Sequence, residues 1–271
     1  MSISTETIKL EIHALDVLSR GNSRIHRIDA RIQLFVTVVF VLSVMSMSRY
    51  DIIALFPFFI YITAIIAIGG LPVISLIKKA LLMSPFAIMI GIFNPFFDKT
   101  PYLNVYGLNI TGGWLSFISI ILRFFLTVEA GLILISVTGM YRICKALRQL
   151  GLPEVFVTQI LFLYRYLFVL IEEGTGMIRA KELRVFNKRQ NNLKLFGRMA
   201  GSLFLRTFNR AQRIYQAMVA RGYKGEIKML ENSKINSVDI MYGIGWTMFF
   251  LAVRFYNIPV LMGSAVLKVF Q

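Results

Sequence analysis

The chain has a single cysteine, Cys144, among its 271 residues, and it is poor in negative charge, with 14 Asp and Glu against 30 Lys and Arg. One cysteine excludes an internal disulfide and any metal site built from several cysteines. Charged residues make up only 16% of the chain, whereas 56% are hydrophobic, and the mean hydropathy is +0.67. A soluble core could not bury that much apolar surface, so the composition indicates an integral membrane protein.

The surplus of positive charge is concentrated in one segment. Residues 142–228 hold 17 basic and 5 acidic residues, a net charge of +12. A basic patch can bind nucleic acid, but long apolar stretches flank this one, so we expect no nucleic-acid partner. The first 31 residues have five basic and four acidic residues and no apolar stretch. We therefore expect no cleavable signal peptide and insertion directed by the first membrane helix.

Five stretches are long and apolar enough to predict helices that cross a bilayer, which requires about 20 helical residues. Asp29 precedes the first stretch and can cap its helix. Pro85 and the Asn94-Pro95 pair lie near the two ends of the third stretch and predict that its tip is kinked or frayed. The five stretches are residues 32–48, 52–70, 80–97, 114–139 and 238–256.

The distribution of Lys and Arg predicts how these helices are oriented. Basic residues precede the first stretch, Lys78 and Lys79 separate the second from the third, and the basic segment separates the fourth from the fifth. Each of the two intervening loops carries one basic and one acidic residue and is neutral. The positive-inside rule then places the N-terminus and the basic segment in the cytoplasm and the C-terminus outside.

A further stretch, residues 155–171, is apolar enough to compete as a membrane span. It contains Arg165 and runs directly into Glu172 and Glu173. If it crossed the membrane, the richest basic stretch would lie outside, against the positive-inside rule. We therefore expect this stretch to form a helix that lies along the inner membrane surface or is buried against the other helices.

The basic segment predicts two long helices. Gly151 followed by Pro153 indicates the end of one helix and the start of the next. The first long helix runs from there to a polar turn at residues 187–192. The second covers residues 193–221 and stops at Gly222. Each would be about 45 Å long.

The second long helix is amphipathic. Its basic face carries Arg206, Arg210 and Arg213, which can be solvated or can face anionic phospholipid. Its other face repeats less polar residues at helical spacing, namely Phe196, Met199, Leu203, Thr207, Ala211, Ile214 and Met218.

Four glycines interrupt the two long helices, with Gly174 and Gly176 in the first and Gly197 and Gly201 in the second. Glycine in a helix interior costs about 1 kcal/mol relative to alanine. Such positions suggest that the two backbones cross closely at these glycines. Local flexibility is the alternative explanation.

Taken in order along the chain, several segments resemble the transmembrane (T) component of energy-coupling-factor ABC importers, in its CbiQ-type cobalt/nickel branch. The resemblance implies an all-α integral membrane protein with about five transmembrane helices and long cytoplasmic coupling helices between the fourth and last spans. It implies spans one to four in residues 1–139, a coupling-helix domain in residues 140–228 and a last span in residues 229–271. The matching segments are IHRIDARIQL at 25–34, LRQLGLPEVFV at 147–157, YRYLFVLIEE at 164–173, RAKELR at 179–184 and QAMVARGYKG at 216–225.

The same resemblance implies which proteins the chain contacts. The two Ala-Arg-x motifs of the family correspond to Ala180-Lys181-Glu182 and Ala220-Arg221-Gly222, whose helix tips would insert into grooves on two ATP-binding ABC subunits. The apolar helix faces would hold a substrate-binding membrane subunit within a prokaryotic inner membrane. The first motif departs from the pattern, because Lys181 keeps the charge of arginine and loses its two-pronged hydrogen bonding. We expect a weaker or differently partnered contact there.

By this resemblance the chain is a non-catalytic subunit that transmits ATP-driven motion for the uptake of cobalt or nickel. No segment reads G-x-x-x-x-G-K-[ST], the phosphate-binding loop of ATPases. His13 and His26 lack companion cysteines or acidic clusters, so they are interpreted as solvent or interface histidines. We expect the chain to bind no nucleotide, metal or other cofactor.

The alternative function is a stand-alone cation channel or carrier. It would need polar groups along a path through the spans, and Glu129 in the fourth stretch is nearly the only candidate. Arg123 lies in the same stretch, six residues earlier, which is too far for the two side chains to pair on one helix face. Both a functional relay and a structural tie between helices stay open for these two residues.

Overall fold

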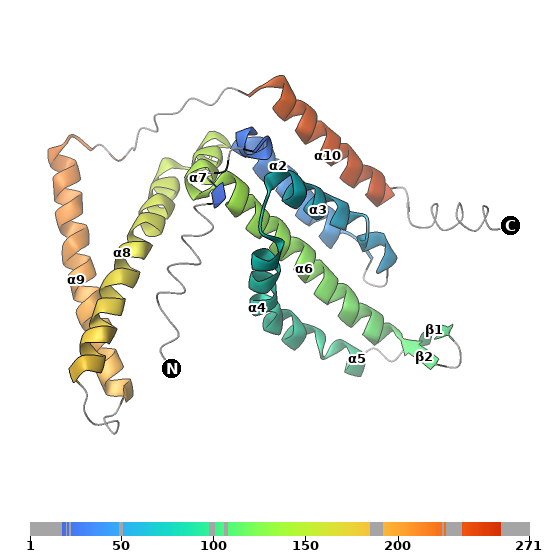
Figure 1. The fold of residues 1–271 in the computed structure, drawn as a ribbon, viewed down its shortest axis with the longest axis horizontal. Coiled ribbons are helices and arrows are strands. Elements are labelled where there is room, and N and C mark those ends of the chain that lie inside the picture. Colours follow the sequence, from blue (N-terminus) through green and yellow to red (C-terminus); the bar gives the residue numbers. More distant parts are fainter. Residues whose placement is uncertain are drawn as a thin grey trace. The chain divides into compact units, whose positions relative to one another are not determined.

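The structure, a computed structural model, describes residues 18–19, 21, 23–48, 51–97, 101–105, 108–184, 192–223, 225 and 235–255. Contacts within the chain divide it into two units. Among the described residues, 18–139 and 235–255 form one of them, called the bundle unit here, and 140–225 form the other, called the hairpin unit. Figure 1 shows the elements of both.

The bundle unit is helical apart from one short antiparallel hairpin, in which Val105 of β1 lies opposite Leu108 of β2. The helical fold class predicted from the sequence is confirmed, with this hairpin as an addition. The elements are η1 (Ile25–Arg27), α2 (Ala30–Met45), η2 (Ile53–Leu55), α3 (Phe58–Gly69), α4 (Val73–Gly91), α5 (Asn94–Phe97), β1 (Pro101–Val105), β2 (Leu108–Thr111), α6 (Gly112–Thr138) and α10 (Ser237–Phe255).

Buried polar contacts fix the start of α2. The carboxylate of Asp29 accepts a hydrogen bond from the backbone N–H of Arg31 at 2.9 Å, which confirms the predicted cap. One turn later, the Gln33 side chain donates to the carbonyl oxygen of Ile25 at 2.6 Å and accepts from the hydroxyl of Thr138. Since Thr138 is the last residue of α6, Gln33 ties η1, α2 and α6 together.

The third apolar helix begins earlier than the sequence predicts. It was expected from residue 80, but α4 begins at Val73, so Lys78 and Lys79 lie within the helix and not in a loop. No proline or glycine lies between Pro72 and residue 80, and a lysine within a membrane helix can extend its ammonium group toward the interface. The predicted break at the other end is confirmed, because α4 stops at Gly91 and the short α5 restarts at Asn94.

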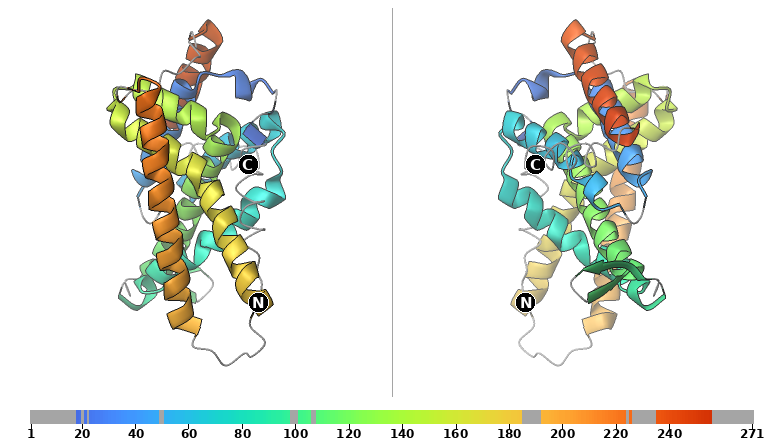
Figure 2. Two further views of the ribbon diagram at one scale, coloured as in Figure 1. Left: turned by 90° about the vertical axis from the view of Figure 1, so that its left-hand side faces the viewer. Right: turned by 90° about the vertical axis from the view of Figure 1, so that its right-hand side faces the viewer.

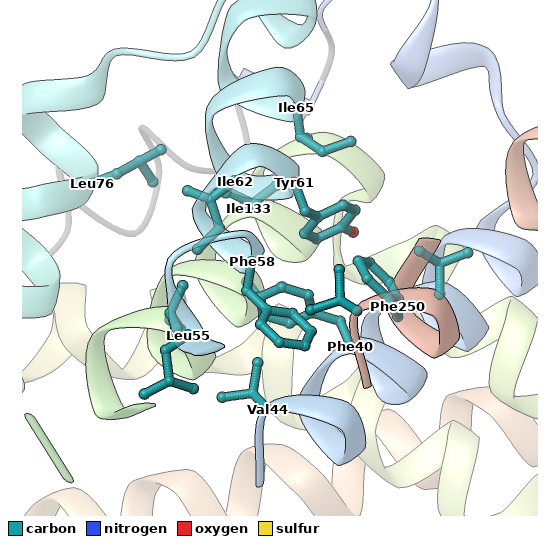
Figure 3. Packing of buried hydrophobic residues seen from close by; sticks show 14 of the residues in the cluster. Phe40, Val44, Leu55, Phe58, Tyr61, Ile62, Ile65, Leu76, Ile133 and Phe250 are labelled. Atoms are coloured by element: carbon teal, nitrogen blue, oxygen red, sulfur yellow. The ribbon is translucent and has the colours of Figure 1, made fainter. Parts of the chain in front are cut away.

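The core of the bundle unit packs aromatic rings among aliphatic side chains (Figure 3). Phe40 of α2 contacts Phe58 of α3 and Phe250 of α10, with ring centroids 5.7 and 5.3 Å apart. Tyr61 of α3 meets Phe250 edge to face at 5.2 Å. These edge-on arrangements are favourable for aromatic pairs. They join three helices that are distant in the sequence.

Four helices in the described residues are long and apolar enough to cross a membrane: α4, α6, α10 and residues Glu154–Lys181 of α8. The first three correspond to predicted spans. The other two predicted spans fall in shorter apolar helices, Ala30–Met45 and Ile53–Gly69. By length and composition α8 thus qualifies as a span, as the sequence indicated for residues 155–171. Its position along the membrane surface, inferred from the charge distribution, stays a prediction.

Large apolar side chains of α4 and α10 point away from the protein. Leu82 and Phe86 in α4 are 74% and 72% exposed, and Met241 in α10 is 73% exposed. Contiguous apolar surface of this kind is rare on soluble monomers. It suits helices whose outer faces contact the hydrocarbon of a bilayer.

The hairpin unit contains α7 (Met140–Gln149), α8 (Glu154–Arg184) and α9 (Asn192–Ala220). The predicted stop at Gly151 is confirmed, since this residue adopts a left-handed φ of 99° just after α7. The N–H of Leu152 donates to the carbonyl of Leu147, which closes a Schellman cap. Arg148 forms an ion pair with Glu154 across the turn, between the last turn of α7 and the first turn of α8.

Candidate functional site

The end of α9 is a Schellman cap built around Gly222. This residue has a φ of 83°, and its N–H donates to the carbonyl of Val219 at 2.9 Å. The N–H of Tyr223 donates to the carbonyl of Met218 at 3.0 Å, five residues earlier. Glycine is favoured at such a position because a Cβ would be strained there. The predicted helix stop at Gly222 is thereby confirmed.

This cap presents Arg221 to the surroundings. Ala220 is the last helical residue, and the side chains of both Ala220 and Arg221 are exposed. The guanidinium group follows the last turn of a long helix, where the helix dipole favours a cation. It can offer its five N–H donors to a partner in a fixed planar arrangement.

The first motif lies in the last two turns of α8, which ends at Arg184. Ala180 is exposed and Lys181 is half-buried, while the side chain of Glu182 lies outside the described residues. The motif therefore also lies near the C-terminal end of its helix, as expected from the sequence. Its lysine is less accessible than Arg221.

The two motifs lie at opposite ends of the hairpin unit. The chain descends along α8 and returns along α9, so the C-terminal ends of the two helices point in opposite directions (Figure 2). With 29 residues, α9 is about 44 Å long. The two motifs are thus too far apart to contribute to one small binding site.

One acidic residue of α8 lies between two arginines of α9. A guanidinium nitrogen of Arg206 lies 3.7 Å from one carboxylate oxygen of Glu173, and a nitrogen of Arg210 lies 3.6 Å from the other. Both arginines are about half exposed or more, so each pair contributes at most about 1 kcal/mol. The predicted basic face was expected to contact solvent or phospholipid. In the structure it turns partly toward α8 instead.

The four helix glycines do not form a close crossing within the chain. A Cβ atom added at Gly176, Gly197 or Gly201 would meet no atom within 4 Å. At Gly174 it would meet only Cδ2 of Leu203, at an ordinary 3.8 Å. The close approach of the α8 and α9 backbones at these positions, predicted from the sequence, is not seen. The physical reason is that side chains separate the two backbones, as the contact of Leu203 at Gly174 shows.

Between α8 and α9 lies an apolar hollow of about 450 Å³, which we call the hairpin groove. From α9 it takes part of the predicted amphipathic face, including Ile214 and Met218. The contribution of α8 was missed in the sequence, although its residues recur at helical spacing. They are Val155, Thr158, Gln159, Phe162, Tyr166, Val169, Leu170 and Glu173.

Comparison with known proteins identifies the family. The sequence profile of CbiQ, described as cobalt transport protein, matches residues 21–231, which is most of the chain and includes both motifs. The chain belongs to the CbiQ family. The resemblance noted in the sequence is thus confirmed, and CbiQ-family proteins are membrane components of cobalt transport systems.

Individual relatives agree with this assignment. The chain is 28% identical over 234 residues to an uncharacterised protein of Methanocaldococcus jannaschii. The aligned segment covers 83% of this chain and 80% of the relative. It is 29% identical over 87 residues to the cobalt transport protein CbiQ of Rhodobacter capsulatus, covering 32% of this chain and 36% of that protein. A putative fused cobalt transport protein CbiMQ of Methanocorpusculum labreanum is 30% identical over 82 residues, 30% of this chain and 14% of that protein.

The histidines and the cysteine considered for metal binding lie outside the two motifs of this CbiQ-family protein. His26 is buried, contrary to the prediction of a solvent or interface histidine, and it bonds to the Ser23 hydroxyl at 2.6 Å and the Leu18 carbonyl at 3.0 Å. The described residues contain no group of three or more His, Cys, Asp or Glu that could hold a metal ion. Cys144 is also buried, and burial raises the pKa of its thiol. His13 lies outside the described residues.

The two ionisable residues of the fourth predicted span have different surroundings. Arg123 donates to the carbonyl oxygens of Met47 and Ser48, just beyond α2, and so acts as a structural tie between helices. Glu129 is 7% exposed, and its Oε2 has no hydrogen-bond partner among the described residues. Of the two roles left open from the sequence, functional relay and structural tie, the contacts support the tie for Arg123. For Glu129 both roles stay open.

Proposed function

We propose that this CbiQ-family protein is the transmembrane T subunit of an energy-coupling-factor ABC importer. In this role it transmits the ATP-driven motion of two ATPase subunits, through α8 and α9, to a substrate-binding membrane subunit. The chain itself is expected to be non-catalytic. Two of its relatives carry the name cobalt transport protein CbiQ, which supports cobalt, or the related nickel, as the transported ion.

The observation that carries the proposal is the placement of the two motifs at opposite ends of one hairpin. Each end presents a basic side chain, Lys181 or Arg221, near a helix C-terminus. Because about 44 Å of helix separates them, each end can contact a separate ATPase subunit. A change in the spacing of the two ATPases would then act on both ends of the hairpin at once.

Exposed apolar residues of α9 support a second partner. Phe204, 68% exposed, stacks on Phe208, with ring centroids 6.3 Å apart, and Leu205 beside them is also exposed. Exposed aromatic pairs are typical of protein contact surfaces. We assign this face to the substrate-binding membrane subunit. That subunit would also determine which ion is carried.

The proposed location is a prokaryotic inner membrane. The chain would cross it several times, with the N-terminus and the hairpin unit in the cytoplasm, as the distribution of basic residues predicts. Only this orientation gives the two motifs access to ATPase subunits, which hydrolyse ATP in the cytoplasm.

The test is the substitution Arg221→Glu in the chain co-expressed with candidate ATPase and substrate-binding subunits from the same organism. We expect loss of cobalt uptake and weaker copurification of the ATPases, because the charge reversal opposes the acidic groups or carbonyls that Arg221 would contact. Arg198→Glu is the matched control, since Arg198 is also exposed on α9 and lies outside both motifs. Membrane insertion of both variants is checked by fractionation.

Normal uptake by the Arg221→Glu variant would exclude this residue from the coupling step. Failure of the unaltered chain to copurify with any ATPase would contradict the T-subunit assignment itself. If the chain is instead a stand-alone cation channel or carrier, it should copurify with no ATPase and should conduct ions in vesicles that contain this chain alone.

A further inference from the structure

The hairpin groove extends along much of α8, as a site for a hydrocarbon chain requires. Its lining runs along α8 from Val155 to Glu173, which corresponds to about 27 Å of helix. Phe162, Tyr166 and Met218 supply apolar surface along it. A volume of about 450 Å³ is within the usual range of small-molecule sites in proteins.

A polar hollow of about 630 Å³ adjoins one end of this groove. The two hollows share Val169, Glu173 and Arg210 in their linings, so they lie next to each other. The remaining residues of the polar hollow are Glu172, Arg206, Asn209 and Arg213. It thus combines three guanidinium groups with two carboxylates.

We propose that the groove and the polar hollow together bind one phospholipid molecule with an ethanolamine headgroup. An acyl chain would lie in the groove between α8 and α9. The phosphate would contact the arginines, and the ammonium group would donate to Glu172 or Glu173. This site is independent of the proposed coupling to ATPases, since it requires only that the chain lies in or on a membrane.

The charge pattern favours this headgroup over the alternatives. A headgroup with negative charge alone would lie against two carboxylates, and a cationic one against three arginines. Choline carries positive charge but has no N–H to donate to a carboxylate. Ethanolamine satisfies both signs, because its phosphate accepts and its ammonium donates charge-assisted hydrogen bonds.

The contacts of Glu173 with the two arginines are longer than direct hydrogen bonds. Its distances of 3.6 and 3.7 Å to Arg210 and Arg206 are longer than the 2.7–2.9 Å or so of charge-assisted hydrogen bonds. The guanidinium groups therefore are not held tightly by this carboxylate. Each arginine has five N–H donors and can contact a phosphate while staying near Glu173.

The experiment uses the full-length chain, purified in detergent and stripped of lipid, with binding followed by native mass spectrometry. Phosphatidylethanolamine, phosphatidylglycerol and phosphatidylcholine are added separately. We expect one phosphatidylethanolamine per chain, bound about tenfold more tightly than phosphatidylcholine, because choline cannot form the hydrogen bond to a carboxylate. Equal retention of the three lipids, or of none, would overturn the proposal.

Matched variants locate the site. Ala211→Trp fills the groove and should abolish the bound lipid, whereas Ala200→Trp on the same helix lines neither hollow and should leave it in place. Helical circular dichroism checks that both variants fold. Unchanged lipid binding by the Ala211→Trp variant would show that the lipid lies elsewhere.

The headgroup assignment has its own test. Glu172→Gln should reduce the preference for phosphatidylethanolamine over phosphatidylglycerol, and Arg213→Gln should weaken binding of every phospholipid. The same measurement on the chain assembled with its partner subunits decides between a lipid and a protein in the groove. Loss of the lipid on assembly would assign the groove to a partner and overturn the proposal, whatever the result for ATPase coupling.

Discussion

Arg123 in α6 donates from its guanidinium group to the carbonyl oxygen of Ser48 at 2.7 Å. The same nitrogen also donates to the carbonyl of Met47 at 3.0 Å. These carbonyls belong to the two residues that follow the C-cap of α2. Arg123 therefore ties α6 to the segment after α2, 75 residues earlier in the chain at Ser48, and finds partners where an unpaired charge would be costly.

Arg123→Met should lower the free energy of unfolding by about 2 kcal/mol, because it removes the charge-assisted hydrogen bonds to the Met47 and Ser48 carbonyls. Thermal unfolding of the purified chain in detergent measures this loss. Arg123→Lys, which keeps the charge and one donor group, should recover part of the stability. A stability equal to wild type in the methionine variant would contradict the tie between α2 and α6.

The packing of α10 on α2 gives a second prediction. A Cβ atom at Gly243 would lie 2.9 Å from Cγ2 of Ile32, whereas one at Gly245 would meet nothing within 4 Å. Gly243→Ala should therefore destabilise the bundle unit by about 1–3 kcal/mol through overpacking. Gly245→Ala, on the same helix, should be neutral or stabilising by up to about 1 kcal/mol. The two midpoints of thermal unfolding should move in opposite directions, and a common shift would contradict the contact.

These residues also show which features the sequence could predict. Asp29, Gly151 and Gly222 act within one or two turns of the chain, so their capping roles follow from local sequence rules. The contacts of Arg123 and Gly243 depend on how distant helices pack, which local spacing does not determine.

The candidate site divides in the same way. That Arg221 and Lys181 lie near helix ends follows from local signals, and their separation follows from two antiparallel helices. The pairing of Glu173 with Arg206 depends on the rotation of α8 relative to α9. The sequence on either side of the joining loop does not specify that rotation.

The cap of α9 gives a third prediction. Because Gly222 has a φ of 83°, the substitution Gly222→Ala should cost about 1 kcal/mol and shift the backbone that carries Arg221. Gly176→Ala is the matched control, since Gly176 lies inside α8 with open space around it and should gain stability from the alanine. Cobalt uptake per inserted protein should fall for Gly222→Ala and stay unchanged for the control. Equal uptake in both variants would mean that the cap does not position a coupling residue.

The position of α8 relative to the membrane is open to a direct test, because length and composition alone allow it to cross. Cys144 is the single cysteine, so Cys144→Ala gives a background in which two exposed positions can be labelled one at a time. They are Leu150→Cys, in the turn before α8, and Ala180→Cys, near the C-terminal end of α8. If α8 lies along the inner surface, a membrane-impermeant maleimide should label both cysteines in inverted vesicles and neither in intact cells. Labelling of the two from opposite sides would make α8 a transmembrane helix. If both cysteines were labelled from outside the cell, Ala180 would lie on the outer side of the membrane. Arg221 would then lie there too, because α9 is not among the candidate spans, and it could not reach an ATPase.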